Sequence, residues 1–266
     1  MPRLLFLGDI VGRPGRRILA ERLQEIRQTH RIDTVVANGE NAAAGAGINA
    51  RLAREILETG VDGLTLGDHI WDQKEFPGEI DQLERVCRPA NLDSASPGRP
   101  HLLLPCGGLR LAVCTLLGHT FMKMKADCPF RAAEKCVPAL RAEADAVLVE
   151  IHAEATSEKI AMGWFLDGQA TLVVGTHTHV PTADATILPR GTAYLTDAGM
   201  TGPYRSVIGR EVDPVLGKML DGLPRKFAVA TEDVWMRGVI VEFDSSGSAQ
   251  SITPLAIPTT SAEAGL

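Results

Sequence analysis

Two histidines one residue apart, His177 and His179, follow a short apolar run in the segment T-L-V-V-G-T-H-T-H-V. Residues two apart on extended backbone project to the same side, so both imidazoles are expected to face one space. Imidazole is a common neutral metal ligand, and two of them at the end of a strand form half of a metal site. Two exposed loop histidines would give the same pattern, so a metal site needs partners elsewhere in the chain.

Four other apolar runs, each predicted to be a strand, also end in acidic or histidine residues. These ends carry Asp9, Glu40 with Asn41, Asp68 with His69, and His152. Taken singly, each has a structural explanation, such as a turn, a helix cap or an interior histidine. In α/β sheets, however, ligands bind beyond the carboxyl ends of the strands. Five strand ends of this kind therefore predict one shared site.

The chemistry of these side chains points to a catalytic metal centre. Carboxylate and imidazole ligands without thiolates are atypical of structural zinc and suit manganese, iron, cobalt or zinc in a catalytic role. There are more candidate ligands than one tetrahedral ion needs, so the sequence predicts a pair of ions. Two ions about 3.5–4 Å apart are the usual arrangement for in-line displacement at phosphorus.

The elements that must position these residues are two β-α units and a third strand, followed by hairpins and a closing sheet. The first three predicted strands cover residues 3–7, 34–37 and 63–66, and helices are predicted after Pro14 and between Asn49 and Gly60. Further helices are predicted at 131–144, before Gly168, and as an insertion at 207–222. Later strands are predicted at 102–104, 109–116, 146–151, 171–175, 186–188, 192–195, 226–231, 237–243 and 251–255.

This order predicts an α/β protein, a four-layer α-β-β-α sandwich of two mixed sheets with the helices outside. No internal repeat, linker or low-complexity block interrupts residues 1–266, which favours one domain. The last residues, about ten and ending in T-T-S-A-E-A-G-L, are expected to be frayed.

Composition limits the classes of partner. A net charge of −6 argues against general binding of nucleic acid or an anionic membrane. Five cysteines without a C-x-x-C pair indicate free thiols in a reducing compartment. No apolar run approaches the roughly 18 residues that cross a bilayer, and the first residues do not form a signal peptide. We therefore expect a cytoplasmic protein, and leave homo-oligomerisation open.

The order of the strand-end motifs resembles the calcineurin-like metallophosphoesterases. G-D, G-E-N, G-D-H, a strand-end histidine and G-T-H-T-H occur in the order of that superfamily's blocks. The longer motifs G-D-I-V-G-R-P-G-R, N-G-E-N-A-A, H-A-E-A-T-S-E-K and T-D-A-G-M-T-G-P are similar to the YmdB-like phosphodiesterase branch over nearly the whole chain. Two departures stand out. Val11 lies where the superfamily usually has a histidine ligand, and Asp68 replaces the asparagine usual in the branch.

The resemblance implies roles for these residues. Asp9, Glu40, Asn41 and His179 would hold one metal ion, and Glu40, Asp68, His152 and His177 the other, with Glu40 bridging. The extra charge of Asp68 is expected to tighten metal binding and to slow substrate entry. Iron or manganese are the expected ions, with zinc or cobalt as alternatives. A hydroxide bridging the ions would attack phosphorus, and His69 would be the general acid that protonates the leaving oxygen. Asp197 is a candidate to orient a ligand histidine through its second ring nitrogen.

Three functions follow from this pattern. The first is a metal-dependent phosphodiesterase, for which the resemblance implies a small cyclic-nucleotide substrate such as a 2′,3′-cyclic form. The second is a phosphomonoesterase or nucleotidase with the same metal centre, for which Arg13, Arg16 and Arg17 offer extra positive charge. The third is a metal-binding regulatory protein that acts through partners, with residues 119–130 and 207–222 as contact surfaces.

Overall fold

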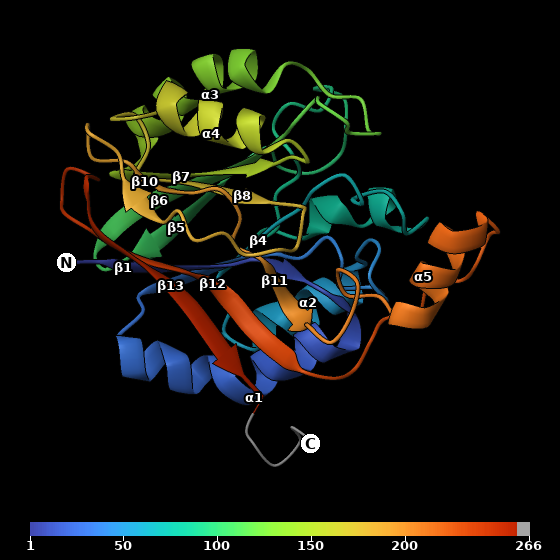
Figure 1. The fold of residues 1–266 in the computed structure, drawn as a ribbon. Coiled ribbons are helices and arrows are strands. Elements are labelled where there is room, and N and C mark those ends of the chain that lie inside the picture. Colours follow the sequence, from blue (N-terminus) through green and yellow to red (C-terminus); the bar gives the residue numbers. More distant parts are fainter. Residues whose placement is uncertain (260–266) are drawn as a thin grey trace.

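Two mixed β-sheets lie face to face, and helices cover the outer surface of each (Figure 1). The structure is a computed structural model that describes residues 1–259. From residue 260 on, the predicted frayed end lies outside the described residues. The first sheet has the order β2-β11-β12-β1-β3-β4, with β13 paired to β12. Its strands are β1 (Arg3–Leu7), β2 (Asp9–Ile10), β3 (Thr34–Asn38), β4 (Gly63–Thr65), β11 (Met200–Pro203), β12 (Val234–Phe243) and β13 (Ala249–Pro258).

The second sheet has the order β5-β6-β7-β8-β10-β9. Its strands are β5 (Leu102–Cys106), β6 (Leu109–Leu117), β7 (Ala146–His152), β8 (Leu172–Thr176), β9 (Thr186–Ile187) and β10 (Ala193–Leu195). The helices are α1 (Gly12–His30), α2 (Ala50–Glu58), α3 (Pro129–Glu143), α4 (Thr156–Phe165) and α5 (Val212–Asp221), with two short 3₁₀ turns at Phe76–Gly78 and Ile80–Gln82. None of the helices in residues 1–259 has the length and apolar character that crossing a bilayer requires.

Parallel pairing places the carboxyl ends of several strands at the same edge of each sheet. In the first sheet β1, β3 and β4 run parallel, while β12 is antiparallel to β1. In the second sheet β6, β7, β8 and β10 run parallel. The carboxyl ends of β3, β4, β7 and β8 carry the predicted ligands, so the pairing sets where those residues can meet.

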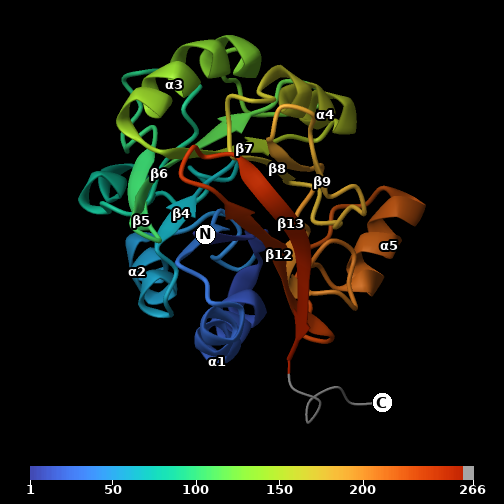
Figure 2. The ribbon, with the colours of Figure 1, turned by 90° about the vertical axis from the view of Figure 1, so that its left-hand side faces the viewer.

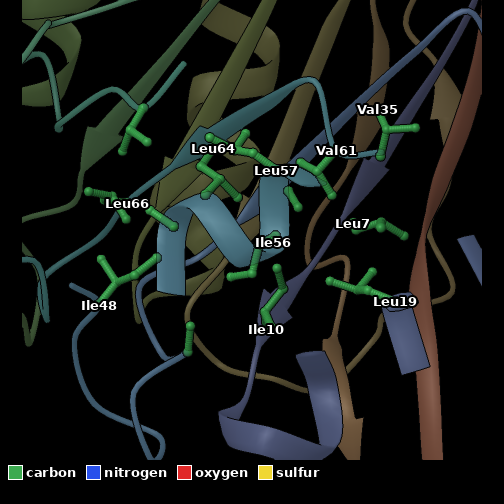
Figure 3. Packing of buried hydrophobic residues seen from close by; sticks show 14 of the residues in the cluster. Leu7, Ile10, Leu19, Val35, Ile48, Ile56, Leu57, Val61, Leu64 and Leu66 are labelled. Carbon is green, nitrogen blue, oxygen red and sulfur yellow. The ribbon is translucent and has the colours of Figure 1, made fainter. Parts of the chain in front are cut away.

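Three apolar interlayers hold the four layers together. The alternation of β1 places Leu4 and Phe6 against the second sheet, and Leu5 and Leu7 toward the helices. Figure 3 shows Leu7 in the helix-side cluster, to which Leu19 of α1 also belongs. A third cluster packs α3 and α4 on the other face of the second sheet. Figure 2 shows α3 and α4 above the sheets and α1 and α2 below them. The predicted four-layer α-β-β-α architecture is therefore confirmed.

Most predicted elements are present, and the deviations have local causes. The sequence predicts a strand at 226–231, but this segment forms only a single β-bridge, between Val229 and Arg210. The prediction is wrong because this segment bonds to the loop before α5 and not to a sheet edge, with Ala230 N–H donating to Gly209 O at 3.0 Å. The short parallel pair of β2 with β11 has no counterpart in the sequence prediction. The predicted insertion at 207–222 contains a helix only from Val212 to Asp221, which ends at Gly222 in the left-handed conformation with φ +74°.

Candidate metal centre

The predicted ligands meet at the seam where the carboxyl ends of the two sheets face each other. Asp9, Glu40 with Asn41, and Asp68 with His69 come from the first sheet. His152 comes from β7 of the second sheet, and His177 and His179 from the turn after β8. Every candidate residue contacts at least one other candidate or lines the same pocket. Residues from distant parts of the chain therefore form one site, as the strand-end pattern predicts.

Four of these side chains form a compact cluster. Glu40, Asp68, His152 and His177 each offer one ligand atom, and these atoms lie within 4.8 Å of one another. His152 Nε2 lies 3.1 Å from Glu40 Oε1 and 3.1 Å from Asp68 Oδ1. The Nδ1 atom of His177 lies 3.2 Å from Asp68 Oδ1 and 3.1 Å from His152 Nε2. This cluster has the size and composition of one metal site.

The remaining candidates extend the cluster on the side of Glu40. The amide nitrogen Nδ2 of Asn41 donates to Glu40 Oε1 at 3.1 Å and lies 3.2 Å from His179 Nε2. Asp9 Oδ1 lies 3.9 Å from the same His179 nitrogen. Glu40 is thus the side chain that borders both groups of candidates. Ligation by Asn41 through its oxygen would need the opposite orientation of its amide.

Outer hydrogen bonds determine which nitrogen of each imidazole carries the proton. Thr176 Oγ1 donates to the carboxylate of Glu150 at 2.6 Å, so it accepts from His152 Nδ1–H at 2.8 Å. Asn38 also donates to Glu150 Oε1, at 2.7 Å. In the neutral imidazole, the lone pair of His152 therefore lies on Nε2, which faces Glu40 and Asp68. This is the arrangement in which a histidine binds metal.

The same reasoning applies to the other two histidines. Glu154 Oε2 accepts from His177 Nε2 at 3.2 Å, which leaves the lone pair of His177 on the inward-facing Nδ1. The carbonyl oxygen of Ile208 accepts from His179 Nδ1 at 2.9 Å, which leaves the lone pair on Nε2. All three imidazoles thus direct lone pairs toward carboxylates or the other ligand candidates. For His152 and His177 these neighbours are carboxylate oxygens, and facing acceptors of this kind fit a bound cation.

Electrostatics support the same conclusion. Asp9 Oδ1 is fully buried and has no hydrogen-bond partner, although buried polar atoms are normally paired. Burial also raises the pKa of Asp9 to about 7. Burial disfavours the charged form of His152, but the nearby carboxylates, Glu40 first, outweigh it and raise the pKa of His152 well above its usual value. Without a cation, bound protons must neutralise part of the negative charge of these carboxylates. The residues present therefore fit a metal centre.

The turn that carries His177 and His179 is not the extended backbone that the sequence pattern suggested. β8 ends at Thr176, and both histidines have positive φ, 91° and 64°. The expectation of strand-like alternation is therefore wrong, although both imidazoles still reach the site. Left-handed backbone at a residue other than glycine costs about 1–3 kcal/mol and is found where the surroundings impose it.

His69 lies beside the cluster and lines a pocket. Its backbone N–H donates to Glu40 Oε2 at 3.0 Å, and its Nδ1 lies 2.7 Å from Asp72 Oδ2. Burial disfavours the charged form of His69. The negative charge of Glu40 and the hydrogen bond to the Asp72 carboxylate outweigh this effect and raise the pKa of His69. The pocket has a volume of about 310 Å³ and is lined by Glu40, Asn41, Gly45, His69, Glu154, His177, Thr178, His179, Ile208 and Arg210.

Comparison with known proteins agrees with this geometry. A family model described as YmdB-like protein matches residues 5–255. The chain belongs to the YmdB-like family. A relative named 2′,3′-cyclic-nucleotide 2′-phosphodiesterase, from Bacillus subtilis (strain 168), is 40% identical over 242 residues, which are 91% of this chain and 91% of the relative. The predicted resemblance to this family is confirmed.

Solved structures of similar proteins share the whole fold. A hypothetical protein from Thermus thermophilus is 44% identical with a TM-score of 0.90, and the match covers 96% of this chain and 99% of that one. A structure described as a novel phosphatase from Mycoplasma pneumoniae is 32% identical with a TM-score of 0.90, covering 96% and 93% of the two chains. The predicted calcineurin-like metallophosphoesterase fold is confirmed.

Several residues of this YmdB-like site are not among those predicted from the sequence. Asn38, Glu150 and Thr176 form the buried support of His152, and Glu154 supports His177. Each lies within two residues of a predicted ligand, which is the signal that would have found them. Arg210 is different, because it reaches the pocket from the loop before α5 and donates to Ala44 O at 2.9 Å. Nothing in the sequence pattern connects that loop with the site.

Proposed function

We propose that this protein is a metal-dependent phosphodiesterase that hydrolyses a small phosphodiester, a cyclic nucleotide of the 2′,3′ type. The predicted enzyme class, a phosphodiesterase, is confirmed by the name of the Bacillus subtilis relative. The observation that carries the proposal is the convergence of Glu40, Asp68, His152 and His177, whose ligand atoms lie within 4.8 Å of one another beside a pocket. The name of the relative supports the choice of substrate.

In this proposal the site holds two ions, iron or manganese. Asp9, Glu40, Asn41 and His179 would hold one, and Glu40, Asp68, His152 and His177 the other. Together the ions would supply Lewis-acid activation of the phosphate and of an attacking water. The unpartnered oxygen of Asp9 and the inward lone pairs of the histidines support this division.

The chain itself supplies the acid and the shape of the site. His69 would donate a proton from Nε2 to the leaving oxygen, since Asp72 engages its Nδ1. Its peptide N–H bond to Glu40 keeps it next to the metal ligands without requiring it to bind metal. A pocket of about 310 Å³ is at the small end of ligand pockets, which suits a mononucleotide and not a long polymer.

The test is an assay of purified protein on bis(p-nitrophenyl) phosphate and on 2′,3′-cyclic AMP, with chelator and with added Mn²⁺. We expect turnover only with metal, and a loss of about 10²–10⁴-fold in kcat for His69→Ala. His101→Ala is the matched control, because His101 lies outside the site and should leave kcat unchanged. Absence of metal-dependent turnover, or full activity of His69→Ala, refutes the proposal.

The phosphomonoesterase alternative loses the support that the sequence suggested for it. Arg16 is engaged by Glu55 Oε1 at 3.0 Å and also donates to Ala42 O at 2.5 Å. Arg13 and Arg17 line a different hollow of the surface, away from His69. Turnover of p-nitrophenyl phosphate above that of the diester would favour this alternative.

A regulatory protein that acts through partners, with weak chemistry, stays a prediction. Catalytically inactive variants that keep full cellular function would favour it.

A further inference from the structure

Thr178 lies between the two ligand histidines, and a buried carboxylate binds it. Its backbone N–H and its hydroxyl both donate to Asp197 Oδ2, at 3.3 and 2.6 Å. The other oxygen of Asp197 accepts from Gly199 N–H at 2.8 Å. Asp197 does not bond to a ligand imidazole, so the predicted direct orientation of a histidine is wrong. Asp197 instead binds the backbone and side chain at the centre of the turn.

A buried lysine completes this arrangement. Lys159, from α4, has no exposed surface, and its Nζ lies 2.7 Å from Asp197 Oδ2 and 3.4 Å from Thr178 Oγ1. A buried charge is costly unless it is paired, so Lys159 and Asp197 depend on each other. Neither residue lines the pocket beside His69. The proposed chemistry therefore has no direct use for this ion pair.

The position of Thr178 gives the ion pair a role. On one side of it, the inward nitrogen of His177 faces Asp68 and His152. On the other side, the inward nitrogen of His179 faces Asn41 and Asp9. Both histidines have the positive φ that side-chain-bearing residues rarely adopt. A single anchor at the centre of the turn therefore acts on both histidines at once.

We propose that the Lys159–Asp197 ion pair is a positioning element that holds Thr178, and through it sets the two histidines for their two ions. This inference rests on the proposed metal centre. It assigns α4 a function that the pocket does not reveal, because the helix supplies the cation that pairs with Asp197 and holds it in place. Loss of the anchor should weaken both metal sites together, whereas loss of one ligand should weaken its own site most.

The experiment compares Thr178→Val, which removes the hydroxyl, with Thr178→Ser, which keeps it. We expect Thr178→Val to raise the Kd for Mn²⁺ about 10–100-fold in both binding steps, measured by calorimetry on metal-free protein. Thr178→Ser should stay within about threefold of the wild type, and Lys159→Met should follow Thr178→Val. Thr192→Val is the matched control, because Thr192 is a buried threonine outside the site. It should lower the unfolding midpoint and leave the Kd unchanged.

Amide hydrogen exchange of residues 176–180 in metal-free protein gives a second readout. Exchange there should be about tenfold faster in Thr178→Val than in the wild type, with Thr178→Ser close to the wild type. If the wild type binds no Mn²⁺, the proposed metal centre fails, and the exchange result still decides whether the anchor holds the turn. Unchanged Kd and unchanged exchange in Thr178→Val overturn the inference. A Kd that Thr178→Ser raises as much as Thr178→Val does also overturns it, because the hydroxyl would then have no part.

Discussion

Replacing Thr176 by valine tests the buried support of His152 most directly. Valine has nearly the shape of threonine, so packing is kept while the hydroxyl is lost. Thr176, Glu150 and His152 are all fully buried. Removing the hydroxyl deprives a buried carboxylate of one hydrogen-bond donor, which costs about 1.5–3 kcal/mol. It also leaves an imidazole N–H without an acceptor, which costs about 1–3 kcal/mol. We therefore expect the free energy of unfolding to fall by roughly 2.5–6 kcal/mol.

The substitution should also weaken metal binding, for a separate reason. Thr176→Val removes the Oγ1 acceptor that holds the proton of His152 on Nδ1, 2.8 Å from that oxygen in the wild type. A proton on Nε2 would instead face Glu40 and Asp68, where the metal is expected. We predict a Kd for Mn²⁺ that is about 10–100-fold higher. Thr176→Ser keeps the hydroxyl and should restore most of the affinity.

The measurements are urea unfolding in the presence of chelator, and calorimetric titration of the metal-free protein with Mn²⁺. Chelator separates the loss of hydrogen bonds from the loss of bound metal, since bound ligands raise apparent stability. A free energy of unfolding within about 0.5 kcal/mol of the wild type would refute the hydrogen-bond argument. An unchanged Kd would refute the assignment of the proton to Nδ1.

Three further substitutions test other parts of the site. Asp68→Asn should raise the Kd for Mn²⁺ about tenfold, because the substitution keeps an oxygen ligand but removes one negative charge from the cluster. Calorimetry of the two proteins measures this difference, and equal affinities would contradict the prediction. Glu154→Ala should weaken Mn²⁺ binding up to about tenfold through His177 but change stability by less than about 0.5 kcal/mol, since its side chain is 49% exposed; a large loss of stability in urea would count against this role. Gly8→Ala should destabilise the protein by about 3 kcal/mol or more, because a Cβ there would lie 2.0 Å from a backbone oxygen. Gly78→Ala, with no atom within 4 Å of its Cβ position, is the control for thermal unfolding and should be close to neutral.

The clustering of the candidate ligands could be predicted from the sequence because the ends of their strands are marked locally. An apolar run followed by glycine and an acid, as at Gly8-Asp9, is visible in one dimension, and parallel strands bring such ends to one edge. The four-layer fold follows from the same regularity, since β-α units and hairpins have distinct spacing. Both predictions depend only on local pattern and on general rules of sheet topology.

Contacts between side chains of distant elements could not be predicted in this way. Nothing near Lys159 indicates that it meets Asp197, because that contact depends on how α4 packs against β8. The positive φ of His177 and His179 could not be predicted either, since it results from hydrogen bonds of this turn to Asp9, Asp197 and Ile208. The wrong prediction of a strand at 226–231 has the same cause, since a local pattern does not show what the segment will contact. Its apolar residues have strand-like spacing, but its backbone bonds to Gly209 and Glu211 of the loop before α5.

The central place of β1 in its sheet has a consequence for how the protein is made. Leu5 pairs with Ile240 of β12, and Asp9 pairs with Met200 of β11. At about 5–20 residues per second, the ribosome needs roughly 10–50 s to travel from the first of these strands to the last. Throughout that interval, Leu4 and Phe6 lack their neighbours on one edge and Asp9 lacks its final position. The proposed metal centre, which includes Asp9, is therefore complete only after β11 and β12 have been made.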